Sequence, residues 1–412
     1  MSWTTLRLQV RTPLFGGDDP ASDEGSPVRV PSIRGALRFW FRAVAAGHGV
    51  SELGALWKDE QEVFGSTHRP SAIGLRVSGH PTASGRRGKP SWATTEKGGF
   101  DGAQYLLGQG LWSYNTGLQR GYVEPGESFE LGIRFSRDKD RGDQVNARFM
   151  LALWAWLTYG GLGARTRRGF GQLVCTAVDG DLSGGWTRTH LLPPADVAGW
   201  AELGECALPG SLPDRTALGW GELLTAPPPA DESHPELPML APRWWGGAVL
   251  EKRAASLGEA LHLAGLHWRR FRSADDNDRG RKPSQSTRSP EWTKVIHGDD
   301  DRYPIAAFGL PVGYFSRSQG KDYKATVTPQ LGTEPLRRAS PVWLRPVPLA
   351  GGRWGVFTHL FYARLLPHDA QLQVDGDKKA TLPVPSDDVV EESWDRWLGG
   401  EARLPDGYFP GS

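Results

Sequence analysis

The sequence predicts an α+β fold of two ferredoxin-like (RRM-like) domains, each with the β-α-β-β-α-β order that RNA-recognition sheets also use. Two observations lead to this prediction. Hydrophobic patterns follow one another in that order within residues 1–182, and 412 residues are too many for one small domain. The 53 glycines and 32 prolines indicate long insertions between the elements.

The first predicted strand and helix show the clearest patterns. Trp3–Arg11 alternates apolar and polar residues, as a half-buried strand does. Ser32 can cap a helix that runs to Gly47, because apolar residues from Ile33 onward recur at helical spacing. The glycine-rich stretch His80–Gln119 is expected to be a long excursion. The remaining elements of this domain are strands at Ala72–Val77, Ser128–Phe135 and Phe170–Val178, and a buried helix at Gln144–Tyr159.

Composition divides the chain into three parts. Residues 1–182 form the first domain, 183–241 form a connector rich in Pro and Gly, and 242–412 form a second, diverged domain. No role is assigned to Thr187–Leu240 or to the polar segment Ser273–Pro290. The second domain is expected to contain a helix at Leu250–Phe271, strands at Ile305–Ser316 and Ala339–Pro346, a strand or buried helix at Trp354–Leu365, and a helix at Glu391–Leu398.

Composition also excludes several classes of protein. The two cysteines, Cys175 and Cys206, exclude a disulfide framework and a cysteine-rich zinc site, and no cofactor is expected. There is no signal peptide and no apolar run of about 18 residues, so we expect a cytoplasmic protein that does not contact a membrane. The net charge of +1 says nothing about a nucleic-acid partner. Arginine makes up 37 of the 48 cationic residues, which suits phosphate binding, although codon bias would give the same excess.

The first predicted helix carries a stripe of arginines. Arg34, Arg38 and Arg42 are four residues apart, and four residues advance about 40° around a helix. The three guanidiniums therefore line one side, away from the core face, with no acidic residue between Ile33 and Gly47 to pair with them. This stripe is either a phosphate-binding surface or an ordinary solvated face.

A glycine–arginine loop is the second candidate feature. Gly160–Gly171 contains five glycines and three arginines, so its backbone can turn sharply and expose N–H groups to an anion. Together with Arg34 and Arg38, this loop would clamp one RNA segment, unless it is only a structural turn. The basic end of the Leu250–Phe271 helix would add further contacts. The RNA-binding candidates outside the stripe are Gly161, Gly163, Arg165, Arg167, Arg168, Phe170 (by base stacking), Arg269 and Arg270.

Several motifs together resemble the RAMP superfamily of CRISPR-associated proteins. They are Thr12–Gly17, Ile33–Arg42, Phe64–Ser66 and the glycine–arginine loop, with Gly309–Pro311 and Arg337–Pro341 in the second half. The aromatic-rich form of Ile33–Arg42 looks most like the first subunit of the type III-B Cmr effector complex. The resemblance leaves Thr187–Leu240 uncovered.

The resemblance implies an RNA-binding, non-catalytic subunit of an RNA-guided antiviral effector. Such a subunit holds the 3′ part of the guide RNA, helps to capture target RNA and contacts other subunits. Base pairing then supplies the sequence specificity, while arginines hold phosphates. A scaffold subunit that contacts only proteins is another possibility.

The alternative activity is an RNA endonuclease of the same superfamily. In relatives that cut RNA, an aspartate in the loop after the first strand does the work. Asp18, Asp19 and Asp23 stand in the corresponding stretch of this chain, so cleavage stays open. His48 is a candidate general base, although a histidine at a helix C-terminus often only stabilises the helix.

Overall fold

The fold is described from a computed structural model. It describes residues 3–16, 28–81, 83–84, 90–93, 100–108, 110–113, 115–213, 215–228, 232–273, 303–316, 323–376 and 379–399. Within these residues, no helix is long and apolar enough to cross a membrane.

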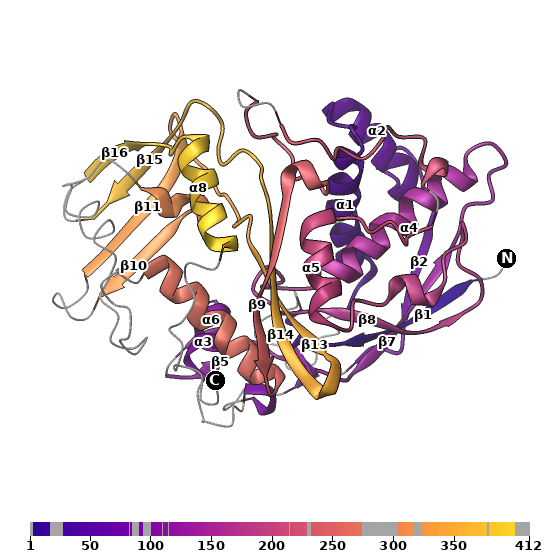
Figure 1. The fold of residues 1–412 in the computed structure, drawn as a ribbon, viewed down its shortest axis with the longest axis horizontal. Coiled ribbons are helices and arrows are strands. Elements are labelled where there is room, and N and C mark those ends of the chain that lie inside the picture. Colours follow the sequence, from indigo (N-terminus) through magenta and orange to yellow (C-terminus); the bar gives the residue numbers. More distant parts are fainter. Residues whose placement is uncertain are drawn as a thin grey trace.

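The first half forms the predicted β-α-β-β-α-β unit (Figure 1). Its strands make one antiparallel sheet in the order β2-β7-β1-β8, which is the ferredoxin-like arrangement. The elements are β1 (Thr4–Val10), α1 (Val30–Gly47), β2 (Gly74–Ser78), β7 (Ser128–Arg134), α4 (Gly142–Tyr159) and β8 (Leu173–Asp179).

Alternation along β1 explains which face of this sheet is covered. Leu6, Leu8 and Val10 are fully buried, whereas Arg7 between them is exposed. The helices α1 and α4 pack against each other, and Figure 1 shows them on one face of the sheet. Burial of one face of each strand therefore fixes the register, because a shift by one residue would expose the whole apolar set.

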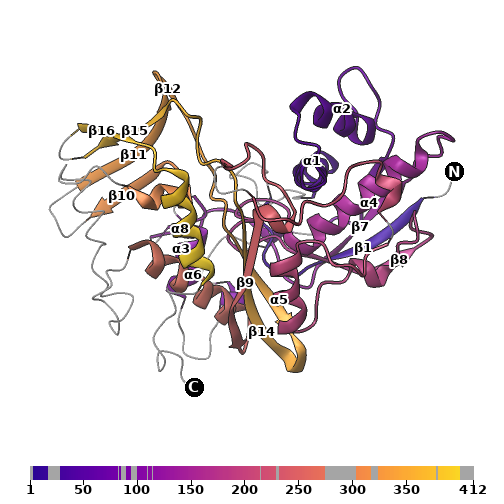
Figure 2. The same ribbon diagram turned by 45° about the horizontal axis from the view of Figure 1, so that its top comes forward.

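The sequence placed most of these elements correctly but missed others. Helix α1 begins at Val30 with Arg29 at its N-cap, so Ser32 lies inside the first turn and is not the cap. Helix α2 (Leu53–Phe64) was not predicted, and Figure 2 shows it beside α1. A short helix, α3 (Asp101–Leu107), lies in the stretch expected to be an excursion and packs on α6 of the second half.

The second half contains two further antiparallel sheets. They have the orders β13-β14-β9 and β10-β11-β15-β16. The first five residues of the predicted helix Leu250–Phe271 belong instead to a strand, and the ambiguous segment Trp354–Leu365 is mainly a strand. The elements are β9 (Trp245–Ala254), α6 (Leu257–Ser273), β10 (Val312–Ser316), β11 (Tyr323–Leu331), β13 (Trp343–Leu349), β14 (Arg353–Phe361), β15 (Ala370–Asp375), β16 (Lys379–Pro383) and α8 (Asp387–Leu398).

Part of this half repeats the plan of the first. The strands β9, β13 and β14 lie in the order β9-β14-β13, as β1, β2 and β7 do in the first sheet, and a helix follows the first strand in both. However, β10 and β11 are inserted after α6, and the described residues give β9 no second neighbour. A complete second ferredoxin-like domain therefore stays a prediction, as do the domain boundaries.

The two halves share an apolar junction. The ring of Trp40 on α1 lies 5.4 Å from the ring of Trp343 on β13 and 5.9 Å from that of Phe361 on β14. The buried Arg345 on β13 donates to the carbonyl oxygens of Leu157 (2.8 Å) and Gly160 (2.6 Å), where α4 ends. Figure 1 shows β9, β13 and β14 between the two halves. The second half thus fixes the start of the glycine–arginine loop.

Candidate nucleic-acid interface

A groove of about 400 Å³ lies between α1 and the glycine–arginine loop. Its volume is in the range of pockets that hold small ligands, roughly 300–1,000 Å³. The groove is formed by four α1 residues, six loop residues, and three residues from other parts of the chain. They are Ser32, Ala36, Phe39 and Trp40 of α1, Gly161, Leu162, Gly163, Ala164, Thr166 and Arg167 of the loop, and Gly16, Arg120 and Trp343.

The glycines of the loop let it fold closely over the segment that follows β1. Gly163 has φ of +90°, and a Cβ atom there would lie 2.2 Å from the carbonyl oxygen of Phe15. The next residue, Ala164, donates its N–H to the same oxygen at 2.8 Å. The predicted sharp turn is confirmed at Gly163. The close approach that it permits is to the chain itself, which positions the outer loop residues along the groove.

Aromatic rings line one side of the groove. Trp40 and Trp343 are almost fully buried, whereas Phe39 is half-buried. The ring of Phe39 lies 5.3 Å from that of Trp40 and 5.8 Å from that of Trp343, and both neighbours fix its orientation. Phe39 is therefore the partly exposed ring of this cluster and can offer an apolar surface to a nucleotide base.

Two guanidiniums give the groove its charge. Arg120 donates to the carbonyl oxygen of Gly16 at 3.4 Å, and Arg167 donates to that of Ser340 at 2.5 Å. The Arg167 guanidinium also lies 5.1 Å from the centroid of the Trp343 ring. Burial, and then the charge of Arg338, lower the pKa of Arg167 to about 10, so it is cationic at neutral pH. Neither arginine has a carboxylate within ion-pair distance in the part of the chain that the structure describes.

The arginine stripe of α1 lies elsewhere. Arg42 forms an ion pair with Glu60 of α2, and Arg38 lies 3.4 Å from the same carboxylate. Arg38 also donates to the carbonyl oxygen of Gly65 at 2.6 Å. Helix α1 itself has no acidic residue, as the sequence shows, but Glu60 of α2 supplies the counter-charge. For Arg38 and Arg42, the predicted free phosphate-binding stripe is therefore wrong.

The predicted clamp is also wrong for the α1 arginines. The groove is lined by Ser32, Ala36 and Phe39, whereas Arg34 and Arg38 do not line it. At about 100° per residue, these arginines lie on the opposite side of α1 from Ala36. Arg34 is half-buried and makes no ion pair with any described residue, but it faces away from the loop. The side of α1 that faces the loop across the groove carries Ser32, Ala36, Phe39 and Trp40.

The outer loop arginines have different environments. Arg165 is exposed and has φ of +62°. Its guanidinium lies beside α3, where a Cβ atom on Gly108 would be 2.6 Å from Nη2. Arg168 is half-buried, donates to the carbonyl oxygen of Val342 at 3.3 Å and stacks 4.2 Å from the ring centroid of Trp268. Neither lines the groove, although Gly161, Gly163 and Arg167 do.

Phe170 was predicted to stack on a base, and this is wrong. Its side chain is fully buried, and its ring packs edge-on against that of Phe15 at 5.5 Å. Trp92 packs on it from another side at 5.9 Å. The residue anchors the end of the loop in the core, since a ring with no exposed surface cannot reach a ligand.

The remaining candidates do not join the groove. Arg269 is half-buried on α6 and lines no part of the groove, while the side chain of Arg270 lies outside the described residues. Asp18, Asp19 and Asp23 also lie outside them.

His48, the candidate general base, is buried. It is only 4% exposed, and its Nδ1 lies 2.9 Å from the carbonyl oxygen of Val44. Burial lowers the pKa of His48. The ring packs beside Trp220 at 5.9 Å, so this histidine ends α1 and has no surface for a substrate.

Sequence reasoning missed Arg120 and Trp343 as groove residues. Arg120 is an isolated cation directly after the expected excursion His80–Gln119, and Trp343 is one of 18 tryptophans. No local spacing marks either residue, because each reaches the groove only through the packing of distant segments. Phe39 carried a weak signal, since it lies beside the apolar face of α1.

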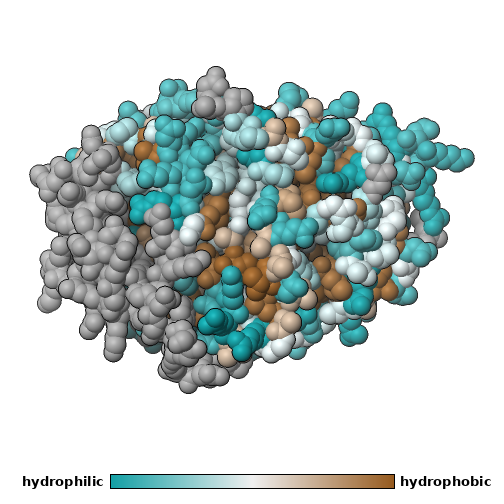
Figure 3. All heavy atoms as spheres, in the orientation of Figure 1, coloured by the Kyte–Doolittle hydropathy of each residue, from teal (hydrophilic) through white to brown (hydrophobic). Residues whose placement is uncertain are grey.

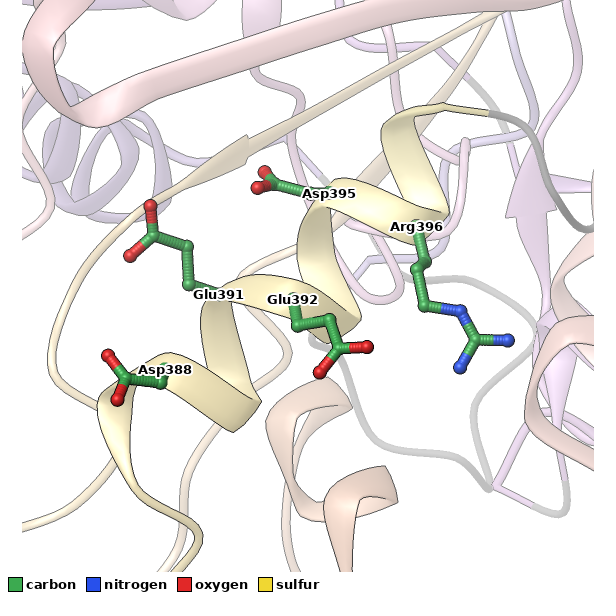
Figure 4. A pocket seen from close by; sticks show the side chains of 5 residues that line it. All are labelled: Asp388, Glu391, Glu392, Asp395 and Arg396. Atoms are coloured by element: carbon green, nitrogen blue, oxygen red, sulfur yellow. The ribbon is translucent and has the colours of Figure 1, made fainter.

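A second hollow, of about 720 Å³, lies on α8 and is acidic. Figure 4 shows Glu391 and Asp395 on one side of the helix and Glu392 and Arg396 on the other. On the face seen in Figure 3, the α8 region is hydrophilic. The described residues hold no cluster of three or more side chains placed to bind a metal ion. The residues that form this hollow are Asp388, Glu391, Glu392, Asp395 and Arg396.

Comparison with known proteins identifies the family. The model of the RAMP superfamily matches residues 7–174, which include α1 and the glycine–arginine loop. The Cmr subunit Cmr1-2 of Pyrococcus furiosus is 32% identical over 173 residues, which is 40% of this chain and 91% of that protein. Cmr1-1 of the same organism is 31% identical over 151 residues, 35% of this chain and 40% of that protein.

A solved structure is similar over the whole chain. The crystal structure of apo Cmr1 from Pyrococcus furiosus aligns with 98% of this chain and 98% of its own, with a TM-score of 0.54 and 20% identity. At this identity the likeness concerns the fold. Taken with the sequence relatives, it shows that the chain belongs to the RAMP superfamily of CRISPR-associated proteins and is most like the first subunit of the type III-B Cmr effector complex.

Proposed function

We propose that this chain is a non-catalytic RNA-binding subunit of a type III-B CRISPR effector complex. It holds the 3′ part of the guide RNA and helps to capture target RNA. The observation that supports this most is the groove beside α1, where Arg120 and Arg167 face a cavity without a carboxylate partner among the described residues. Because the described residues leave these charges without an ion-pair partner, the groove favours a polyanion.

The lining of the groove suits RNA held without regard to sequence. The two guanidiniums bind phosphates, and the partly exposed ring of Phe39 stacks on a base. No described carboxylate lines the groove to accept hydrogen bonds from cytosine or guanine amino groups. Base pairing between guide and target then provides the specificity.

The partners follow from the same proposal. The two Pyrococcus furiosus relatives, Cmr1-2 and Cmr1-1, are subunits of a CRISPR system. We expect this chain to assemble with other subunits and to work on RNA within that complex.

Fluorescence anisotropy with labelled single-stranded RNA tests the groove. Arg120→Gln should weaken binding about tenfold, because a charge-assisted hydrogen bond contributes roughly 1.5–3 kcal/mol. Arg120→Lys keeps the charge and should restore part of the affinity. Arg353→Gln is the matched control, since Arg353 is exposed at the far end of β13–β14 and should bind as the wild type does. Equal affinity of Arg120→Gln and Arg353→Gln would contradict the groove assignment.

The salt dependence gives an independent measure. Each phosphate contact with single-stranded RNA contributes about −0.7 to the slope of log K against log salt. The two groove guanidiniums therefore predict a slope of about −1.4 for a short RNA that fills only the groove. A flat response would rule out phosphate contacts.

Whether the chain cuts RNA is tested with the same RNA. We expect the labelled strand to stay intact with and without Mg²⁺. Defined cuts that disappear in Asp23→Ala or His48→Ala would show that the chain is a nuclease and would overturn the non-catalytic part of the proposal.

A further inference from the structure

Four arginines gather beside the groove, where the two halves meet. Arg167 and Arg168 come from the glycine–arginine loop, Arg272 from α6, and Arg338 from the segment before β13. We call them the junction cluster. All four are half-buried. Burial is the main cause of the lowered pKa of Arg167 and of Arg168, and the like charges of Arg338 and Arg272, respectively, lower these pKa values further.

The loop arginines belong to the first half and contact residues of the second half. Arg168 reaches the carbonyl oxygen of Val342, and Arg167 reaches that of Ser340. The guanidiniums of Arg168 and Arg272 both lie over Trp268, at 4.2 and 5.6 Å from its ring centroid. A backbone hydrogen bond also links the two halves here, because the N–H of Leu344 donates to the carbonyl oxygen of Arg167 at 3.0 Å.

No carboxylate neutralises the junction cluster within the described part of the chain. Its partners are carbonyl oxygens and aromatic rings, and the Nε atoms of Arg272 and Arg338 are buried without a hydrogen-bond acceptor. Burial lowers the pKa of Arg168 to about 9. Like charges held close together in a half-buried site repel each other strongly, because little water screens them.

Several arginines of the first half are paired with acids, in contrast to the junction cluster. Arg148 lies 3.3 Å from Asp59 and 3.8 Å from Glu62, and Arg141 lies 2.5 Å from Glu62. At these positions the chain supplies a carboxylate to an arginine that holds α2 and α4 together. No described residue gives the junction cluster such a counter-charge, and an anion from outside would relieve its repulsion.

We propose that the junction cluster is a second phosphate-binding subsite, which receives the backbone of an RNA strand as it leaves the groove and passes onto the second half. This inference rests on the proposed RNA-binding function. Arg167 belongs to both sites, because it lines the groove and donates to the carbonyl oxygen of Ser340, two residues after Arg338. A strand that follows the cationic side chains would run from α1 across the loop to α6.

The subsite makes RNA length the decisive variable. An RNA of about three nucleotides can fill the groove alone, whereas one of about twelve can also cover the junction cluster, a length within the site sizes of roughly 4–16 nucleotides of single-strand binders with other folds. The long RNA should bind more tightly than the short one. Its salt slope should be about −3.5, from phosphate contacts of Arg120 and the four cluster arginines at about −0.7 each.

The test compares both RNAs with the full chain and with Arg272→Gln/Arg338→Gln. We expect this double variant to lose at least about tenfold in affinity for the long RNA and to reduce its salt slope by about 1.4. Binding of the short RNA should stay within about twofold. Arg7→Gln/Arg353→Gln removes two exposed arginines and is the matched control, with no loss expected at either length. Arg272→Lys/Arg338→Lys should recover part of the long-RNA affinity.

Each outcome separates this inference from the proposed function. Failure of the wild-type chain to bind RNA of either length would sink the proposed function itself. Binding of the short RNA without any gain from length would overturn only the subsite. An equal loss at both lengths, with a lowered melting temperature, would mean that the cluster acts by holding the halves together. Unchanged RNA binding with lost assembly would assign the cluster to an acidic protein partner, which also overturns the inference.

Discussion

The groove beside α1 and the hollow on α8 are both built on helices, yet they carry opposite charge. Arg120 and Arg167 face the groove, whereas four acids and one arginine form the α8 hollow. The net charge of +1 hides this contrast completely. A polyanion is attracted to one region and repelled by the other, so the charge distribution, and not the total, would orient the RNA that we propose as the ligand.

The two regions also differ in how their charges are partnered. Under α8, the buried His234 lies 3.4 Å from both Asp387 and Glu391, so the chain itself uses acids of this helix. In the groove, the arginines donate to the carbonyl oxygens of Gly16 and Ser340, and no carboxylate of the described residues compensates their positive charge. A charged residue therefore indicates a ligand site only when its partners within the chain are known.

Gly163→Ala tests how much the groove depends on the loop, and we expect the largest effect. A side chain at φ of +90°, with its Cβ 2.2 Å from the oxygen of Phe15, should destabilise the fold by at least about 2 kcal/mol. Thermal unfolding and RNA binding should both weaken. Gly35→Ala is the control: no atom lies within 4 Å of its Cβ, so this helical site should gain about 0.5–1 kcal/mol. A stable, fully active Gly163→Ala would show that the loop tolerates another path.

Charge reversal in the groove should have the next largest effect. Arg120→Glu places a carboxylate where we expect a phosphate, and RNA affinity should fall by well over tenfold, more than for Arg120→Gln. Titration of labelled RNA at low and high salt measures this, and the difference should shrink as salt rises. If affinity were unchanged, the groove would not be the RNA site, although the family assignment would stand.

Acid sensitivity should arise beneath the groove at His359. This histidine is fully buried and stacked between Trp245 and Trp343, and burial lowers its pKa well below the ordinary value. Below about pH 6.5, the unfolded chain binds a proton that the folded chain does not, so stability falls as pH falls. His359→Gln should be less stable than the wild type at pH 7.5, but its free energy of unfolding should fall less than that of the wild type between pH 7.5 and pH 5. Parallel melting curves against pH for the two proteins would contradict this.

The smallest effect is expected at α8. Asp388→Asn/Glu392→Gln removes two acids from the hollow, and RNA affinity should change by less than about twofold, with any change being a slight gain. Anisotropy with the same labelled RNA measures it. A marked loss of affinity would mean that this acidic region contacts the RNA complex, and the contrast between the two regions would then fail.

Much of the first half could be predicted from local patterns. The alternation of Leu6, Leu8 and Val10 and the helical spacing from Ile33 onward identified β1 and α1, because burial on one face imposes the period of the element. Helix α2 was missed, since its charged residues obscure the pattern. Two of them, Glu60 and Glu62, are buried as partners of distant arginines.

The candidate site was predicted less well, and the errors share one cause. Arg38, Arg42 and Phe170 look free to bind a ligand in the sequence, but in the fold Glu60 pairs with the two arginines and Phe15 packs against Phe170. Arg345, which fixes the start of the loop, is 185 residues away from Gly160. A local sequence pattern cannot predict contacts between residues that are so far apart in the chain.

By itself, the sequence determined the β-α-β-β-α-β order, the sharp glycine turn and the family resemblance, because each depends on residues close together in the chain. Only the tertiary structure decided which arginines remain unpaired. Counter-charges and aromatic neighbours come from segments that meet only after folding, and Glu60 of α2 made Arg38 and Arg42 of the α1 stripe its ion-pair partners. The same packing brought Arg120, Arg167 and Trp343 to the groove.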